Sequence, residues 1–324
     1  MNVNRSTILN DWIKQFYPND YKIEPASSDA SFRTYFKITS NNQSKIIMDA
    51  PPNHEQIKPF LDITYLLKEA GLNVPEIFEV NEEDGFILMS DLGKSLYLSQ
   101  LNNETVYCLY TDAIDAIHKM QSNIDTTNLN IFNEGEYMFE MNLFKKWFLQ
   151  EHLKLNINKN ELMTIENCFK ELVVLINKIP VSFTHRDFHS RNLLMTEKNN
   201  PGIIDYQDAV VGPITYDLVS LLKDCYISWD ENLVYEIVKT SMPKITSNHN
   251  VDEFFFWFDI TGVQRHLKAI GIFSRLYYRD NKKDFINDIP RTYSYIHNTI
   301  NKYSELNEMK RCFNNIKLSE ILNL

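Results

Sequence analysis

Glycine is scarce in this sequence, with 8 residues among 324. A flexible glycine-rich linker is therefore excluded, and each glycine that is present marks a predicted turn. The four cysteines, Cys108, Cys168, Cys225 and Cys312, include no CxxC pair. This spacing argues against a zinc site or a disulfide framework, and it predicts buried, reduced thiols.

An excess of positive charge and long apolar runs are also lacking. Acidic residues outnumber basic ones by 43 to 33, which gives a net charge of −10, whereas a nucleic-acid-binding surface needs basic stripes. The first dozen residues are polar and contain no apolar signal segment. The longest aromatic cluster, Phe254–Phe258, is far too short to cross a bilayer. We therefore expect a cytoplasmic protein with no nucleic-acid or membrane partner.

The pattern of apolar residues changes near Gly93. Before it, short or alternating apolar segments predict strands, and after it the apolar residues follow helical spacing. The first part has predicted strands at 31–40, 45–50, 76–80 and 85–90 and helices at 6–17 and 54–70. The second part has predicted helices at 106–120, 136–155, 159–178 and from Pro213 to the end, with short strands at 192–196 and 202–206. The sequence thus predicts an α+β fold with a small antiparallel sheet in a lobe over 1–92 and a larger, mainly helical lobe over 93–324.

The most informative stretch is 181–208. It contains His185-Arg186-Asp187, then Asn192 five residues after the aspartate, and Asp205 at the end of an apolar segment. Phosphoryl transfer needs a carboxylate that orients the attacking hydroxyl and oxygen ligands for Mg²⁺. Asp187 suits the first role. Asn192 and Asp205 suit the second, as ligands of the Mg²⁺ that bridges the phosphates of ATP.

This pattern resembles the catalytic loop and metal-binding aspartate of protein-kinase-like enzymes, H-x-D-x-x-x-x-N followed by a strand and an aspartate. The resemblance implies a bilobal fold with the nucleotide in the first lobe and the catalytic loop in the second. It also implies that Asp217 braces the catalytic loop. An ordinary acid in the first turn of a helix is the alternative for Asp217. His185 is expected to hold the loop by hydrogen bonds rather than to take part in the chemistry.

The sequence departs from protein kinases where they bind ATP. The loop that would cover the phosphates has no glycine, and Ser28 and Ser31 are the candidate phosphate-binding residues there, with a plain polar turn as the alternative. Asp49 stands near the position of the expected strand lysine. Arg33 and Lys37 are the candidates to replace that cation, unless they are solvated strand charges. Met89 is also assigned to the nucleotide site.

Several blocks in order narrow the resemblance. They are SDASFRTYF at 28–36, MDAPP at 48–52, GLNVP at 71–75, MSDLG at 89–93, THRDFHSRN at 184–192, IDYQDAVVGPITYDL at 204–218 and GVQRHLK at 262–268. They resemble the cell-wall-recycling sugar kinases of the aminoglycoside-phosphotransferase superfamily, in which MDAP also stands where other kinases keep lysine. That group phosphorylates the anomeric hydroxyl of N-acetylmuramic acid and N-acetylglucosamine. The resemblance implies ATP as co-substrate, Mg²⁺ as cofactor and a role in peptidoglycan recycling.

Three charged residues are candidates for the sugar site of the helical lobe. Asp208 and Asp224 are predicted to hold sugar hydroxyls, and Arg265 to meet the lactyl carboxylate of muramic acid. Structural ion pairs are the alternative for all three. For the aromatic run Phe254–Phe258, helix core is favoured over a sugar-stacking face.

Two other functions stay open. One is another small-molecule kinase of the superfamily, of the aminoglycoside, choline or homoserine type. The other is a catalytically dead, kinase-like binding protein. A protein kinase is disfavoured, because only seven residues separate Asp205 from Pro213. We expect a monomer, while the preferred amino sugar and its anomer are not predicted.

Overall fold

The computed structural model describes residues 3–18, 21–28, 32–246 and 249–323. Its contacts divide the chain into two compact units. Unit 1 comprises Met1–Ser95 and Leu193–Asp208, and unit 2 comprises Leu96–Asn192 and Ala209–Leu324. The segment 193–208 therefore packs with the first part of the chain, although the residues on both sides of it belong to unit 2. The two lobes predicted over 1–92 and 93–324 stay a prediction.

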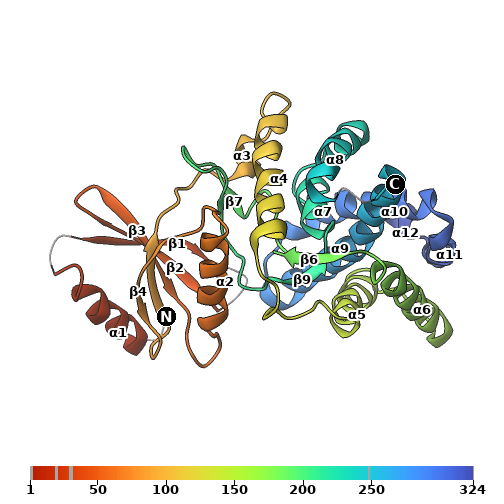
Figure 1. The fold of residues 1–324 in the computed structure, drawn as a ribbon. Coiled ribbons are helices and arrows are strands. Elements are labelled where there is room, and N and C mark those ends of the chain that lie inside the picture. Colours follow the sequence, from red (N-terminus) through yellow and green to blue (C-terminus); the bar gives the residue numbers. More distant parts are fainter. Residues whose placement is uncertain (1–2, 19–20, 29–31, 247–248, 324) are drawn as a thin grey trace. The chain divides into compact units, whose positions relative to one another are not determined.

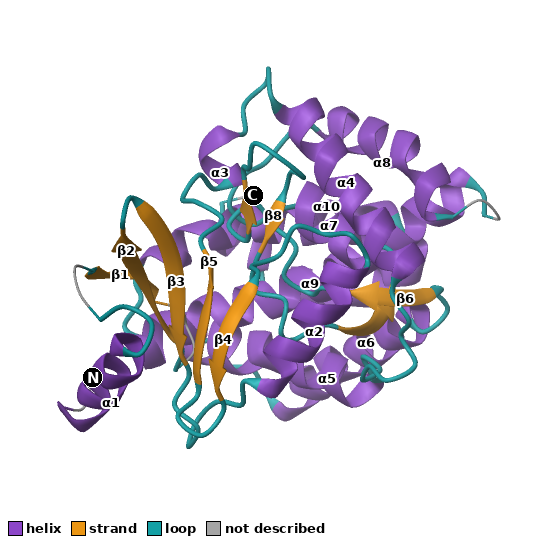
Figure 2. Ribbon diagram, turned by 60° about the vertical axis from the view of Figure 1, so that its left-hand side comes forward, coloured by secondary structure: helices purple, strands orange, loops and turns teal. Residues whose placement is uncertain are grey.

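Unit 1 is built on a five-stranded antiparallel sheet of order β1-β2-β3-β5-β4 (Figure 2). The strands are β1 (Lys22–Ser28), β2 (Thr34–Ser40), β3 (Gln43–Asp49), β4 (Ile77–Asn81) and β5 (Phe86–Ser90). The predicted hairpin of β4 and β5 is confirmed. Strand β1 was not predicted, because Pro25 and a register shift before Ser27 disturb its pattern. An edge strand tolerates both features.

Two helices accompany this sheet (Figure 1): α1 (Val3–Lys14) and α2 (Lys58–Glu69). Helix α1 buries Leu9, Trp12 and Ile13 in one cluster with Ile38 and Phe86 of the sheet. Helix α2 begins at Lys58 with Pro59 in its first turn, four residues later than predicted, since Pro51 and Pro52 are followed by a turn.

The segment that returns to unit 1 carries two short paired strands, β7 (Leu193–Leu194) and β8 (Gly202–Ile203). The Ile203 N–H donates to the carbonyl of Asn73 at 2.8 Å. Tyr206 stacks on Phe60 of α2 with 5.1 Å between ring centroids, and its hydroxyl lies 2.9 Å from that of Thr64. These contacts hold the residues around Asp205 in unit 1.

Unit 2 is mainly helical. Its elements are α3 (Tyr97–Gln100), α4 (Val106–Asn123), α5 (Glu134–Leu143), the π-helix η1 (Phe144–His152), α6 (Lys159–Ile176), β6 (Val181–Thr184), β9 (Val210–Pro213), α7 (Tyr216–Leu222), α8 (Glu231–Ile245), α9 (Val251–Asp280), the 3₁₀ helices η2 (Asp284–Asp288) and η3 (Ser304–Leu306), α10 (Ile289–Lys302), α11 (Asn307–Asn315) and α12 (Leu318–Ile321). No helix within the described residues is long and apolar enough to cross a bilayer.

Helix α9 is the centre of unit 2, and every residue from Trp257 to Lys268 on it is buried. A helix buried all round has no solvent face on which to place charge. Its glycine Gly271 permits a close approach, because a Cβ there would lie 2.4 Å from the backbone nitrogen of Phe144. Phe254, Trp257 and Phe258 are core residues of this helix, as favoured from the sequence.

Two predictions about unit 2 were wrong. Pro213 ends the strand β9, which pairs with β6, and it does not start a helix; α7 starts three residues later. Neither strand was predicted, since each has only four residues and no clear alternation. The thiols are unpaired as expected, but Cys108 is exposed rather than buried.

Candidate active site

The predicted catalytic loop, residues 185–192, follows strand β6 and is held by Asp217 of α7. The two carboxylate oxygens of Asp217 accept the N–H groups of His185 at 2.7 Å and Arg186 at 3.0 Å. Burial raises the pKa of Asp217 to about 7, while these two donors favour its charged form and oppose that rise. The imidazole Nδ1 of His185 in turn accepts the N–H of Asp187 at 3.3 Å. The loop is thus anchored immediately before the candidate catalytic residue.

Arg186 takes a left-handed backbone conformation, with φ at +75°. This conformation is uncommon outside glycine, costs roughly 1–2 kcal/mol, and occurs often at functional sites. Its guanidinium donates to Glu140 of α5 and lies 4.8 Å from the ring centroid of Phe132. Glu140 also accepts from Gln264 of α9 at 2.8 Å. The side chain of Arg186 therefore ties the turned loop to α5 directly, and to α9 through Glu140.

Asp187 lies at a cavity of about 90 Å³ within unit 2. Its carboxylate keeps 36% of its side-chain surface exposed and lies 3.9 Å from the ammonium of Lys268. Burial raises the pKa of Asp187, but nearby positive charge, that of Lys268 above all, outweighs it and holds the pKa of this carboxyl below its usual range. The cavity is also lined by His189 and Arg265, and by the rings of Tyr226 and Phe273. The cavity thus presents an ionised carboxylate, nearby cations and aromatic rings to any molecule that binds in it.

The second half of the loop is held by Asp224 and Asn192. Asp224 accepts the N–H of Ser190 at 2.9 Å and its hydroxyl at 2.5 Å, and its other oxygen accepts the N–H of Tyr226 at 2.9 Å. The Asn192 amide nitrogen donates to the carbonyl of Asp187 at 3.0 Å, which orients the amide group. Through these hydrogen bonds Asp224 holds the loop in place. Its role toward sugar hydroxyls stays a prediction.

Arg265 is a buried residue in the wall of this cavity. Its Nε donates to the hydroxyl of Ser220 at 2.5 Å, and one terminal nitrogen lies 3.5 Å from the sulfur of Cys225. It keeps 6% of its surface exposed and still lines the cavity. The structure thus brings Asp187, Asn192, Asp217, Asp224 and Arg265 together in unit 2.

Asp205 and Asp208 belong to unit 1. Asp205 has a left-handed backbone, with φ at +64°, and its carboxylate accepts from the amide of Gln207 at 2.9 Å. Aspartate adopts this conformation more readily than most residues, and the turn separates β8 from the exposed Asp208. The metal and substrate roles of these two residues stay predictions.

Two of the candidate nucleotide residues of unit 1 have carboxylate partners. Arg33 pairs with Glu55 at 3.2 Å, and Lys37 pairs with Asp91 at 2.6 Å. Met89 is buried within β5. Ser28 ends β1 opposite Thr34, and Ser31 lies outside the described residues.

One ion pair in unit 1 was not predicted. Arg5 of α1 donates through Nε to Asp49 at 2.8 Å and through its terminal nitrogen to the carbonyl of Asp84 at 2.7 Å. Asp49 is the residue that stands where a strand lysine was expected, so α1 supplies its counter-charge. The sequence offered no signal for this pair, since 44 positions separate the two residues.

The donor chemistry of Asn192 and Asp205 fits Mg²⁺, which prefers hard oxygen ligands and completes its shell with water and phosphate. No group of three or more His, Cys, Asp and Glu residues suited to a metal occurs in the described part of the chain. The role of Asn192 and Asp205 as ligands of Mg²⁺ stays a prediction.

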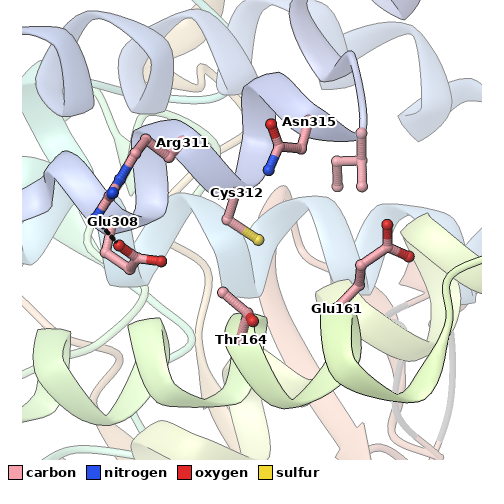
Figure 3. A pocket seen from close by; sticks show the side chains of 7 residues that line it. Glu161, Thr164, Glu308, Arg311, Cys312 and Asn315 are labelled. Carbon is pink, nitrogen blue, oxygen red and sulfur yellow. Dashed lines mark hydrogen bonds and ion pairs between the residues drawn. The ribbon is translucent and has the colours of Figure 1, made fainter.

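A second cavity, of about 170 Å³, lies between α6 and α11 (Figure 3). Its lining includes Glu161, Thr164 and Cys312, and Glu308 there pairs with Arg311. It shares no lining residue with the cavity at Asp187. Cavity size alone therefore does not locate the chemistry in unit 2.

Sequence reasoning missed Glu140 and Lys268. Glu140 stands on the apolar face that Tyr137, Met141 and Phe144 form on α5 and η1, and a charge on such a face is itself a signal. Lys268 follows Arg265 by three residues within a block noted for its resemblance, so the two share one face of a helix.

This chain is similar to a known protein family and to enzymes of two bacteria. The family model described as "Phosphotransferase enzyme family" matches residues 22–241. The N-acetylmuramate/N-acetylglucosamine kinase of Pseudomonas aeruginosa is 36% identical over 318 residues, which cover 93% of this chain and 94% of that protein. The enzyme of the same name from Neisseria meningitidis is 35% identical over 313 residues, 93% of each chain.

A solved structure shows the same fold at much lower identity. Aminoglycoside phosphotransferase APH(2'')-Ib, bound to ADP, superposes with a TM-score of 0.60 at 16% identity and covers 91% of this chain and 98% of its own. The α+β architecture of a small antiparallel sheet and a helical unit is that of the protein-kinase-like fold. This chain belongs to the phosphotransferase enzyme family.

Proposed function

We propose that this phosphotransferase is an ATP-dependent kinase that converts N-acetylmuramic acid, N-acetylglucosamine or both to the sugar 1-phosphate. The supporting observation is an ionised Asp187 at a cavity lined by two permanent cations, Arg265 and Lys268. The chain around it is 36% identical to a kinase named for these two sugars.

The charge of the cavity bears on the class of acceptor. Arg265 and Lys268 line it beside one carboxylate, Asp187, so a polycationic aminoglycoside or a choline headgroup would meet two cations there. A neutral N-acetylated sugar would not be repelled, and the carboxylate of N-acetylmuramate would be attracted. Arg265 remains our candidate for that carboxylate, and Asp208 and Asp224 for sugar hydroxyls.

Asp187 accepts a hydrogen bond from the anomeric hydroxyl in this proposal and takes its proton late in the transfer. A hemiacetal hydroxyl is more acidic than an ordinary alcohol, so a carboxylate of low pKa suffices, and orientation matters more than base strength.

Asn192 and Asp205 would hold Mg²⁺, which would neutralise charge on the phosphates of ATP. The nucleotide would bind unit 1 near Ser28, Ser31 and Met89. We place the enzyme as a cytoplasmic monomer in peptidoglycan recycling.

The test is a coupled ADP-release assay with N-acetylmuramic acid, N-acetylglucosamine, glucose, kanamycin and choline as acceptors. We expect turnover with the two acetylated amino sugars alone, a product that no longer reduces copper, and loss of the rate when EDTA removes Mg²⁺. Turnover with kanamycin or choline in place of the sugars would contradict the proposal. A product that still has its reducing end would contradict the anomeric position.

A further inference from the structure

Lys268 approaches the candidate catalytic carboxylate from α9. Its ammonium lies 3.9 Å from Asp187 and 3.3 Å from Glu140, and the residue is buried except for 9% of its surface. A buried cation needs an anionic partner, and these two carboxylates supply it. Lys268 also lines the cavity, so its charge is directed at whatever occupies that space.

These contacts orient the ammonium of Lys268, and they leave it able to donate a further hydrogen bond. Glu140 already receives the guanidinium of Arg186 and the amide of Gln264. Elsewhere in unit 2, the ammonium of Lys223 reaches its carboxylate partner, Asp259 of α9, at 2.6 Å. Both contacts of Lys268 are longer, which leaves room for a further acceptor at the ammonium.

Some cations of unit 1 also have carboxylate partners. Three that sequence or position would assign to phosphate each have a carboxylate partner: Arg5 with Asp49, Arg33 with Glu55 and Lys37 with Asp91. Developing charge on a transferring phosphoryl group calls for a positioned cation. Unit 2 holds such a cation directly beside the group that orients the acceptor.

We propose that Lys268 is a catalytic residue whose ammonium contacts the phosphoryl group during its transfer. The inference rests on the proposed function. The acceptor oxygen forms a bond to the γ-phosphorus while the bond from that phosphorus to the β–γ bridging oxygen breaks. The bonding electrons leave with ADP, and the hydroxyl proton passes to Asp187. Lys268 donates a hydrogen bond to an oxygen of the phosphoryl group and itself loses no proton.

The kinetic test compares Lys268→Met, Lys268→Arg and wild type. We expect Lys268→Met to lower kcat by about 100- to 1,000-fold, as the loss of one transition-state donor does. Its KM for the sugar should change by less than about threefold, because the contact forms mainly in the transition state. Lys268→Arg should recover part of the rate. An unchanged kcat, or a raised KM with kcat retained, would overturn the inference; the second result would make Lys268 an acceptor-binding residue.

A binding test without sugar separates this inference from the proposed function. ADP with aluminium fluoride and Mg²⁺ imitates the planar phosphoryl group, and it should raise the melting temperature of wild type well beyond ADP and Mg²⁺ alone. Lys268→Met should lose that extra increase while keeping the increase due to ADP. An equal increase in both proteins would refute the role of Lys268, whichever acceptor the enzyme uses. The absence of sugar turnover by wild type would refute the proposed function instead.

Lys302→Met is the matched control. Lys302 is also a lysine of unit 2 paired with an aspartate, at 2.8 Å from Asp259, and it does not line the cavity. It should lose some stability and keep both kcat and the response to aluminium fluoride. A parallel loss of kcat in Lys302→Met would show that removing any paired lysine disturbs the unit, and would overturn the specific role of Lys268.

Discussion

Two carboxylates in unit 2 meet lysines of the same unit in different ways. Asp259 of α9 is fully buried and accepts from Lys223 at 2.6 Å, Lys302 at 2.8 Å, and the hydroxyls of Tyr235 and Tyr303 at 2.7 Å. Asp187 has one ion-pair partner within 4 Å among the described residues, Lys268 at 3.9 Å, and keeps 36% of its side chain exposed.

The difference is the one expected between a structural charge and the catalytic carboxylate that we propose. A buried carboxylate stabilises a fold only when donors of the protein saturate its oxygens, and Asp259 meets that condition. Asp187 has a pKa held low by positive charge, and 36% of its side chain stays exposed. In unit 2, the carboxylates of Asp217, Asp224 and Glu140 therefore hold the loop around Asp187. The carboxylate of Asp187 itself makes few contacts with the protein.

The largest effect is expected when Asp187 is replaced. Asp187→Asn should lower kcat by about 10²- to 10⁴-fold, since the amide neither accepts the proton nor carries the charge. The free energy of unfolding should fall by about 1 kcal/mol, because Lys268 loses one of its two anionic partners and keeps Glu140. Steady-state kinetics and urea denaturation measure the two quantities. A variant as active as wild type would remove Asp187 from the chemistry.

Asp259→Ala should show the reverse pattern. Removing this anion leaves two cations and two hydroxyls without their partner, which should cost about 3–5 kcal/mol of stability. The kcat of the folded fraction should stay within about twofold of wild type, because Asp259 does not line the cavity at Asp187. Urea denaturation and the assay at low temperature test both. A stable variant would show that the cluster is dispensable.

Glu140→Gln should lie between these extremes. The amide keeps the size of Glu140 but loses the charge that holds Arg186 and Lys268, so we expect a loss of about 2 kcal/mol in stability. The kcat should fall by about tenfold, because the left-handed backbone at Arg186 loses its anchor. A pure stability effect with unchanged kcat would show that Glu140 does not position the loop. Exposed Glu134 on the same helix, changed to Gln, is the matched control.

The smallest effect concerns pH. Burial raises the pKa of Asp259, but the charge of Lys223 and several hydrogen bonds outweigh it and hold this pKa below the ordinary value. The resulting stabilisation is present above the ordinary aspartate pKa and is lost as the pH falls through the lowered value in the folded protein. Unfolding free energies of wild type and Asp259→Asn should therefore converge below about pH 4. A constant difference down to pH 2 would contradict the shift.

Local sequence patterns were enough to predict most helices and the strands β2 to β5. Alternation and helical spacing are local properties, and they were clear in these segments. The four-residue strands β6 and β9 carried no such pattern, and the start of α2 depended on which proline enters its first turn. Local patterns also gave no sign that residues 193–208 pair with Asn73 and pack on Phe60, contacts that hold this segment in unit 1.

The sequence by itself determined the family and nominated Asp187, Asn192 and Asp205, because phosphoryl transfer requires these groups at a short, recognisable spacing. Only the tertiary structure decided which charges meet. Arg5 finds Asp49 across 44 positions, and Glu140, Arg186 and Lys268 converge from two helices and a loop. Coulomb attraction depends on distance in space and on burial, and neither quantity is encoded in the local pattern of residues.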